Sequence, residues 1–156
     1  MGGRFSHLPP GEGVDYDREN DHTFVKVAAE DTDGAYTLME DNLKASFQLG
    51  LHRHDHHAET FYFLEGVVDF YADGRWIKAV PGTTIHVPPG MPHACRAGNG
   101  EPAKMLMIYQ PSGFDGFLAE LGQMAESDFQ DEAKMMALNE RYDIIMMGPV
   151  PPHPDD

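Results

Sequence analysis

The sequence predicts an all-β fold, in which short strands close into a barrel or form the two facing sheets of a jelly roll, followed by one or two short helices. From Thr23 onward, runs rich in β-branched and aromatic residues recur about every ten residues. Turn residues separate these runs, and the chain holds 16 Gly and 12 Pro. The apolar residues take up a helical period only after Pro111. About nine short strands are too many for one open sheet in so small a chain, so the sheet should close.

Length and composition limit the class of protein. A chain of 156 residues and 17.4 kDa has the size of a single domain. Its formal net charge of -15, from 11 Lys and Arg against 26 Asp and Glu, repels phosphate backbones and anionic lipid surfaces. We therefore expect neither nucleic acid nor a membrane as partner. A single Cys closes no intrachain disulfide, and no signal peptide or apolar run of ~20 residues is present, which predicts a cytoplasmic protein.

Residues 1–22 are expected to form an N-terminal arm. The first twenty residues are rich in Gly and Pro and hold few apolar side chains, too few to offset the entropy of ordering them. Two interpretations stay open at this stage. The segment is either a loosely held terminus or an arm that pairs with a partner subunit.

Residues 23–110 are expected to form the barrel. Three dipeptides, Asp33-Gly34, Glu65-Gly66 and Asp73-Gly74, suit tight hairpin turns and predict that successive strands are antiparallel. The expected strands are Thr23 to Ala29, Ala35 to Glu40, Lys44 to His54, Thr60 to Leu64, Val67 to Tyr71, Trp76 to Val80, Thr83 to Val87, His93 to Ala97 and Lys104 to Tyr109.

Residues 111–156 are expected to form a helical extension that packs on the barrel. Apolar residues at i, i+3, i+4 and i+7 predict a first short helix, and these are Phe114, Phe117, Leu118 and Leu121. A second helix is expected over Ser127 to Tyr142, with Ser127 or Asp128 as N-cap. The tail from Gly148 to Asp156 holds four Pro and should be irregular.

The segment His52-Arg53-His54-Asp55-His56-His57-Ala58-Glu59 concentrates four of the nine His of the chain in eight residues. Side chains two apart on a strand project to the same face, so His52 and His54 present two imidazoles together. A short turn then brings Glu59 back beside them. Two imidazoles and a carboxylate suit Fe(II), Mn(II), Co(II), Ni(II) or Zn(II). His93, which follows the rigid turn Pro88-Pro89-Gly90, is the candidate fourth ligand.

Two stretches of the chain resemble the two motifs of the cupin family. His52-x-His54, four residues, Glu59, six residues and Gly66 is similar to the first motif, and the spacing from Gly82 through Pro88 to His93 is similar to the second. One departure concerns the second motif, which usually ends in Asn four residues after its His, where this chain has Ala97. The resemblance covers roughly residues 35–110, and a weaker one over 110–114 is similar to single-domain cupins akin to bacterial quercetin dioxygenases.

The cupin resemblance implies a jelly-roll β-barrel that binds one divalent transition metal, Fe, Mn, Ni, Co or Zn, inside it. His52, His54, Glu59 and His93 are the implied ligands. Phe61 and Phe63 share strand parity with Glu59 and should point inward, either to fill the barrel or to line a substrate pocket. Cys95 shares parity with His93 and either faces the same pocket or is inert filler.

The remaining His residues of these segments are not expected to be ligands. His56 and His57 are assigned to the pocket rim or to solvent, and His86 is expected to be a structural, hydrogen-bonded His.

A metal-dependent oxygenase is the first functional expectation. In it Glu59 takes up a proton from a small enolisable or aromatic substrate, and O2 is a candidate co-substrate. A lyase, isomerase or cyclase that uses the metal as a Lewis acid is the alternative, and a non-catalytic small-molecule-binding protein is the third. No phosphate loop or serine elbow is present, which disfavours phosphoryl transfer and serine hydrolysis. Cupin barrels commonly associate through an outer sheet, so a homodimer is expected.

Overall fold

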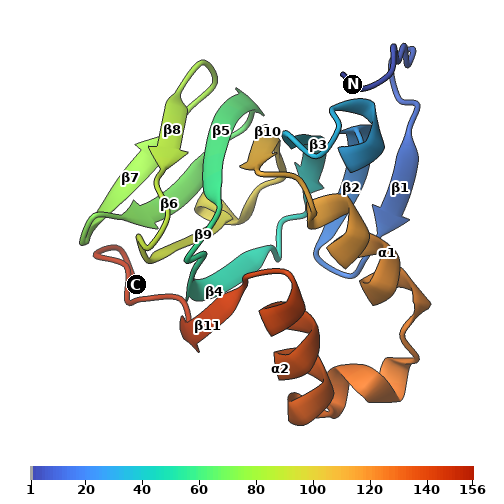
Figure 1. Ribbon diagram of the computed structural model, residues 1–156. Coiled ribbons are helices and arrows are strands. Elements are labelled where there is room, and N and C mark those ends of the chain that lie inside the picture. Colours follow the sequence, from blue (N-terminus) through green and yellow to red (C-terminus); the bar gives the residue numbers. More distant parts are fainter. Residues whose placement is uncertain (1) are drawn as a thin grey trace.

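Two antiparallel sheets face each other, and two helices lie at one end of them (Figure 1). The computed structural model describes residues 2–156. The first sheet has the order β1-β2-β3-β10-β5-β8 and the second β11-β4-β9-β6-β7. Their bounds are β1 Val14–Asp17, β2 Asp21–Val27, β3 Thr37–Leu43, β4 Gln48–Arg53, β5 Ala58–Glu65, β6 Val68–Ala72, β7 Arg75–Ala79, β8 Thr84–Val87, β9 His93–Ala97, β10 Ala103–Gln110 and β11 Ile145–Gly148. The predicted jelly-roll architecture is confirmed.

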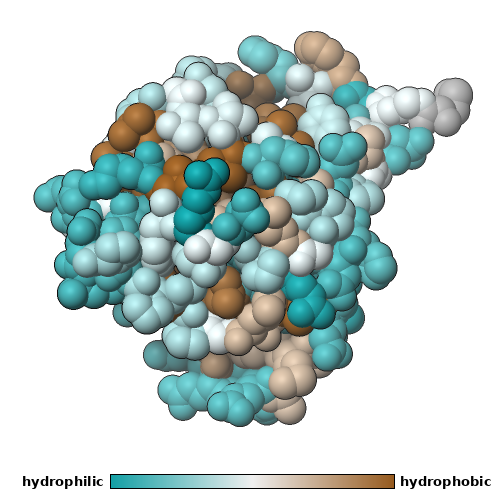
Figure 2. Space-filling model, turned by 90° about the vertical axis from the view of Figure 1, so that its left-hand side faces the viewer, coloured by the Kyte–Doolittle hydropathy of each residue, from teal (hydrophilic) through white to brown (hydrophobic). Residues whose placement is uncertain are grey.

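The core lies between the two sheets, because alternate side chains of each strand point to the same face. In β3 the inward positions are Thr37, Met39, Asp41 and Leu43, all buried. Phe61 and Phe63 in β5 are 3% and 1% exposed, so both point inward as their parity predicted. The side of the molecule at the left of Figure 1 is mainly hydrophilic, with hydrophobic patches among the polar residues (Figure 2).

The turn predictions hold at one dipeptide and fail at another. Asp73-Gly74 joins β6 and β7 as a tight hairpin, and both residues have positive φ, 51° and 72°. Glu65-Gly66, expected to close a hairpin, instead carries the chain from β5 in one sheet to β6 in the other. Gly66 is required there because a Cβ atom would lie 2.4 Å from the carbonyl oxygen of Pro102. A turn dipeptide therefore predicts where the chain turns, but not whether the two flanking strands pair with each other.

The ends of the barrel differ from the expected boundaries. β1 lies within the segment assigned to the arm and pairs with β2 of the same chain. The expected strand Lys44 to His54 starts only at Gln48, because residues 44–47 form a turn closed by a hydrogen bond of 2.9 Å from the Phe47 amide to the Lys44 carbonyl. This turn lets β4 leave the sheet of β3 and join the opposite one.

The first predicted helix is present as α1, Phe114–Gln123, which buries Phe117, Leu118 and Leu121. The second is split into a 3-10 segment, Glu126–Gln130, and α2, Glu132–Arg141, because Asp131 caps α2 by accepting a hydrogen bond from the Lys134 amide. β11 then pairs with β4 and ends at Gly148. Residues 149–156 form no helix or strand, as predicted for the Pro-rich tail. Within residues 2–156, no helix has the length and apolar character to cross a membrane.

Candidate metal centre

Four buried side chains from the two sheets meet inside the barrel. His52 lies near the end of β4, His54 just after it, Glu59 in β5 and His93 at the start of β9. β4 and β9 pair with His52 opposite His93, which places two of the imidazoles side by side. One candidate ligand atom from each of the four residues lies within 4.8 Å of all the others. We call these four residues the quartet; the structure brings together all the metal ligands that the sequence predicted.

Each imidazole of the quartet is held by a backbone carbonyl. The Nδ1 atom of His52 lies 2.8 Å from the Gly50 oxygen, and that of His54 lies 2.9 Å from the Asp143 oxygen. The Nδ1 atom of His93 lies 3.1 Å from the Met91 oxygen. A carbonyl oxygen only accepts, so each Nδ1 carries the proton, and the Nε2 atom of a neutral ring is left with a lone pair.

The Nε2 atoms of His54 and His93 face the carboxylate of Glu59. His93 Nε2 lies 3.1 Å from Oε2 of Glu59, and His54 Nε2 lies 3.4 Å from Oε1. The latter nitrogen is buried without a hydrogen-bond partner among the described residues. Two ligands at about 2.1 Å from one ion are separated by about 3.0–3.4 Å, so the observed spacing fits a shared divalent cation. The residues therefore fit the metal that the cupin motifs imply.

Burial and mutual contact set the protonation of the quartet. Burial lowers the pKa of His52 to about 4, which keeps this ring neutral at pH 7. Burial acts to raise the pKa of Glu59, but the close contact with His54 and His93 outweighs it and holds that pKa well below its usual range. The carboxylate is thus ionised and three imidazole nitrogens surround it, a donor set suited to a divalent ion.

The C-terminal extension completes this centre through Asp143, which sequence reasoning did not single out. Its carbonyl orients His54, and its carboxylate accepts hydrogen bonds from the amides of Asp55 and His56 at 2.9 and 2.7 Å. The His57 ring donates to the same carboxylate over 2.7 Å, which is the role of a loop anchor rather than a ligand. No local pattern marks Asp143, because its role depends on a positive φ of 59° and on contacts with residues almost ninety positions earlier.

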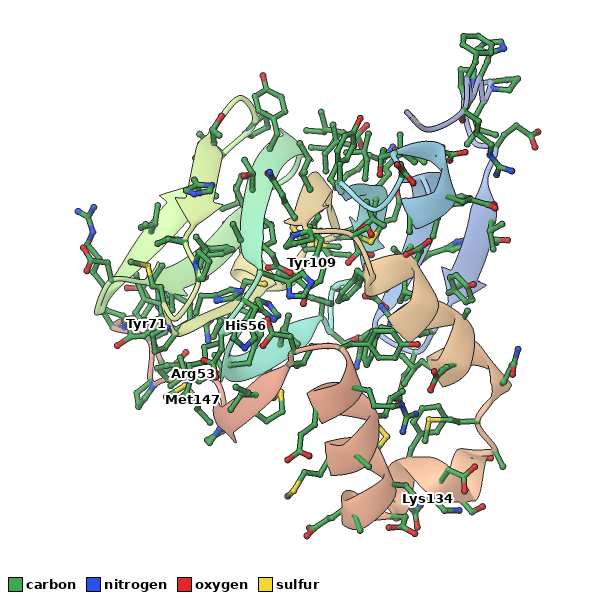
Figure 3. The ribbon with its side chains drawn as sticks, viewed as in Figure 1. Arg53, His56, Tyr71, Tyr109, Lys134 and Met147 are labelled. Carbon is green, nitrogen blue, oxygen red and sulfur yellow. The ribbon has the colours of Figure 1, made fainter. Side chains whose placement is uncertain are left out.

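Tyr109 links the barrel to this extension. Its side chain lies in the middle of the molecule, between the sheets and α1 (Figure 3). The hydroxyl group donates to the Tyr142 carbonyl over 2.8 Å, and the ring stacks on His57 with centroids 4.3 Å apart. Tyr109 pairs with Glu59 across β10 and β5. Its hydrogen bond therefore fixes Tyr142, the residue before Asp143, to the strand that lies beside Glu59.

A cavity of about 200 Å³ opens next to the quartet. His52, His54, Glu59 and Phe61 line one part of it, and side chains of the C-terminal extension cover it, namely Phe114, Phe117, Leu121, Met135, Asn139, Ile144 and Met146. The lining also includes Met105, Met107, Asp41, Asp21 and Arg18. The cavity is therefore mostly apolar, with polar groups at the quartet, in the Asp41 region and at Asn139.

Three other residues named from the sequence lie away from this lining. Among the described residues, Phe63 and Cys95 are not on the cavity wall; both belong to the core between the sheets. Burial raises the pKa of the Cys95 thiol, so the thiol stays protonated. His86 is exposed on the outer face, where Nδ1 hydrogen-bonds the Thr60 hydroxyl at 2.9 Å, in agreement with a structural role.

Comparison with known proteins agrees with this geometry. Residues 41–109 match the family described as "Cupin domain", Cupin_2. This part of the chain is a cupin domain. It holds all four members of the quartet and every strand that positions them except β11.

Similar proteins include enzymes of different kinds. Quercetin 2,3-dioxygenase of Bacillus subtilis (strain 168) is 31% identical over 102 residues, which are 65% of this chain but 30% of that protein, so the match spans less than a third of its length. KdgF from Halomonas sp. superposes with a TM-score of 0.63 at 16% identity, over 71% of this chain and 99% of that one. The polyketide cyclase RemF from Streptomyces resistomycificus does so with 0.60 at 19%, over 68% and 79%. At such identities the two structures establish the cupin fold alone.

Proposed function

We propose that this cupin is a metal-dependent oxygenase similar to quercetinase, acting on a small enolisable or aromatic substrate. The observation that carries the proposal is the quartet itself, in which three oriented imidazoles and one ionised carboxylate lie beside a cavity. A structural metal site is closed by its protein ligands, whereas a site that borders a cavity leaves room for a reactant. The sequence similarity to a quercetin dioxygenase supports the oxygenase class.

His52, His54 and His93 would hold the metal, and Glu59 has two roles in the proposal. A bound divalent ion would supply Lewis acidity toward a substrate hydroxyl and, if redox-active, a means of using O2. Glu59 reaches the reacting end of the cavity with an ionised oxygen, which can accept the proton of that hydroxyl. The proton moves to a carboxylate oxygen of Glu59 and the substrate becomes an enolate. Phe61 forms the apolar wall beside this reacting end.

The size of the cavity favours a small substrate. A core cavity of about 150 Å³ is sufficient to bind benzene. The 200 Å³ beside the quartet therefore suits one six-membered ring with small substituents. Drug-sized ligands usually occupy about 300–1,000 Å³, so a three-ring flavonol fits less well than a catechol or an enediol. We infer that the substrate places two adjacent oxygens at the quartet and an apolar ring against Phe61.

Oxygen uptake tests the proposal. The protein is loaded separately with Fe(II), Mn(II), Co(II), Ni(II) and Zn(II) and supplied with a catechol, an acyclic enediol and a flavonol, while dissolved O2 is recorded. We expect metal-dependent uptake with the smaller substrates and none after removal of the metal by a chelator. Absence of uptake with every metal and substrate, in protein that retains its ion, would contradict the oxygenase assignment.

A second candidate is a lyase, isomerase or cyclase that needs no O2. The similarity in fold to a polyketide cyclase favours this class, because a Lewis-acidic ion and the Glu59 base would serve such a reaction equally well. Anaerobic conversion of an enolisable substrate separates it from the oxygenase. Tight ligand binding without conversion under either atmosphere would identify a binding protein instead.

We also propose that the protein is a homodimer. The outer face of the sheet that contains β5 and β10 exposes the apolar side chains of Tyr62 and Ile108, 45% and 36% accessible. These two residues stand on paired strands, and burying them between two copies would remove apolar surface from water. Light scattering at micromolar concentration should give twice 17.4 kDa. A mass of one chain would exclude the dimer.

A further inference from the structure

The cavity has a second polar end, formed by residues of β2 and β3. Asp41 and Asp21 are 3% and 5% exposed, and both line the cavity together with Arg18. Most carboxylates of this acidic chain are on the surface, so a buried pair needs a physical reason. We call Arg18, Asp21, Thr23 and Asp41 the acid-pair end; the quartet is the metal end.

A connected set of hydrogen bonds holds the acid-pair end together. Arg18 binds Asp21 with two bonds, 2.8 Å from Nε to Oδ1 and 2.6 Å from Nη2 to Oδ2. The Thr23 hydroxyl donates to Oδ1 of Asp41 over 3.0 Å. The Asp21 carboxylate lies close enough to act on the charge of Asp41, and two neighbouring carboxyl groups are favoured when one of them holds a proton. Arg18 thus neutralises one carboxyl group and leaves the other to hold a proton.

The charge balance of the acid-pair end indicates what it can bind. Burial and the nearby Asp21 carboxylate raise the pKa of Asp41 to about 8, so Asp41 is mostly protonated at neutral pH. Arg18 and Asp21 form an ion pair, so together with a neutral Asp41 they carry no net charge. Such a group has no net attraction for an anion or a cation, but it both donates and accepts hydrogen bonds. An uncharged hydroxyl group is the complementary partner.

The acid-pair end is well separated from the metal end. Asp41 pairs with Met105 across β3 and β10, while Glu59 pairs with Tyr109 across β5 and β10. Met105 and Tyr109 are four residue steps apart along β10, a distance of about 13 Å. The apolar side chains of Met105, Met107 and Phe61 line the cavity between the two ends.

The acid-pair end also borders a groove on the surface of the molecule. A larger open groove of about 790 Å³ runs along α1 and the loop between β1 and β2. Five residues line both this groove and the inner cavity: Arg18, Asp21, Phe47, Leu49 and Leu121. They form the wall that the two spaces share. A substrate that entered through this wall would pass the acid-pair end first and reach the metal end last, so its trailing end would lie near Asp41.

We propose that Asp41 is a substrate-positioning residue, which hydrogen-bonds an uncharged hydroxyl on the trailing end of the substrate while the leading end is bound at the quartet. The inference rests on the proposed function for the leading end. The metal end of the same cavity holds His54 Nε2, which is buried and has no hydrogen-bond partner among the described residues. The substrate class that follows is a single ring with two adjacent oxygens on one side and a short hydroxyl-bearing chain on the other.

Matched ligands can test this role without knowledge of the natural substrate. The probes are 4-(2-hydroxyethyl)catechol and 4-ethylcatechol, which differ by one hydroxyl group. Binding is followed through the visible spectrum of the Co(II)-loaded protein, which reports directly on the metal end. We expect the wild type to bind the hydroxylated probe about tenfold more tightly, the value of one hydrogen bond within a cavity.

Two variants separate positioning from a structural role. Asp41→Leu should retain one Co(II) per chain and lose the tenfold preference, with unchanged affinity for 4-ethylcatechol. Asp41→Asn keeps an uncharged donor and acceptor and should restore the preference to within about threefold of the wild type. If Asp41→Leu does not fold, Thr23→Val replaces it, because loss of the hydroxyl that orients Asp41 should lower the preference about threefold.

The outcomes distinguish failure of this inference from failure of the proposed function. Equal binding of the two catechols by the wild type, or a preference that survives in Asp41→Leu, would overturn the role of Asp41 and leave the metal end unaffected. If neither catechol binds, the proposed catechol-type substrate is wrong. Binding at the acid-pair end is then measured by NMR titration with 2-phenylethanol and with ethylbenzene, which also differ by one hydroxyl group. Equal affinities of the wild type for these two compounds would overturn the inference.

Discussion

Glu59 and Asp41 are both buried carboxyl groups that line one cavity, yet Glu59 is ionised and Asp41 is protonated. Glu59 faces His54 and His93 at 3.4 and 3.1 Å and is ionised, with its pKa well below the usual range. Asp41 faces a second carboxyl group, and its pKa is raised to about 8. Burial acts on both in the same direction, so the neighbours decide the charge. The metal end therefore suits a cation, and the acid-pair end suits a neutral hydroxyl.

The largest expected effect is the loss of the metal end in the double variant His52→Ala and His54→Ala. Removal of two of the four ligands should lower metal affinity by about a thousandfold or more, since most of the binding free energy comes from direct ligation. Metal analysis after dialysis measures the occupancy. His86→Ala is the matched control, because His86 is exposed on the outer face and contacts Thr60. Undiminished occupancy in the double variant would remove the basis for calling the quartet a metal site.

Glu59→Gln separates metal binding from proton transfer. The three imidazoles should retain most of the metal, while turnover should fall by about a hundredfold or more, the usual contribution of a positioned base. A metal lowers the pKa of a coordinated hydroxyl, so the residual rate should rise with pH. Steady-state rates on metal-replete protein, measured across a pH series, provide the test. Full activity with the metal in place would show that Glu59 is not the base.

Asp143 tests whether the C-terminal extension supports the metal end. Asp143→Ala removes the carboxylate that holds the loop of residues 55–57 and strains a position with φ 59°. We expect metal affinity to fall by about 10–100-fold, as for other residues that hold a metal ligand in place without contacting the metal. Asp143→Asn tolerates the same φ and should lose less. Competition with a chromophoric chelator measures both, and wild-type affinity in Asp143→Ala would mean that His54 needs no such support.

Asp41→Asn should have the smallest effect on ligand binding, and its stability reports the charge state of the acid-pair end. From about pH 4 to about pH 8 the folded wild type keeps a proton on Asp41 that the unfolded chain has released. The unfolded state then binds fewer protons, so the Asp41 contribution to stability falls as the pH rises and levels off above about pH 8. Asn has no such proton to lose.

The variant should therefore match the stability of the wild type near pH 4 and be the more stable of the two near pH 8. Asp21 and Arg18 are the charged groups that face Asp41, and both are present in the two proteins. Urea unfolding at the two pH values measures the difference in stability. A difference that does not change with pH would show that Asp41 is ionised throughout.

The metal end could be predicted from the sequence, whereas most of the acid-pair end could not. His52, His54 and Glu59 lie within eight residues, and ligand chemistry combined with strand parity places them on one face. Asp41 and Asp21 lie on two strands with an ordinary spacing of charges, and nothing in the local pattern marks them as buried. Their burial follows from the pairing of β2 with β3 and from the cover supplied by α1, which are long-range features.

The same contrast applies to the fold. Strand positions were predicted well because alternation and turn residues are local signals. The move of the chain between sheets at Gly66, the pairing of β1 with β2 and the pairing of β11 with β4 depend on contacts between distant segments. Asp143 belongs to this second group, because its role depends on a hydrogen bond with the loop of residues 55–57, far away in the sequence.

The most direct test of the central claim is X-ray absorption spectroscopy on protein loaded with one equivalent of Zn(II). We expect one tightly held ion per chain, with a nitrogen and oxygen shell at about 2.0–2.1 Å and the outer-shell scattering of three imidazoles. His52, His54 and His93 would supply those rings, and Glu59 the carboxylate oxygen. An ion that dialyses away, a sulfur ligand at about 2.3 Å, or a spectrum with fewer than three imidazoles would contradict the assignment of the quartet.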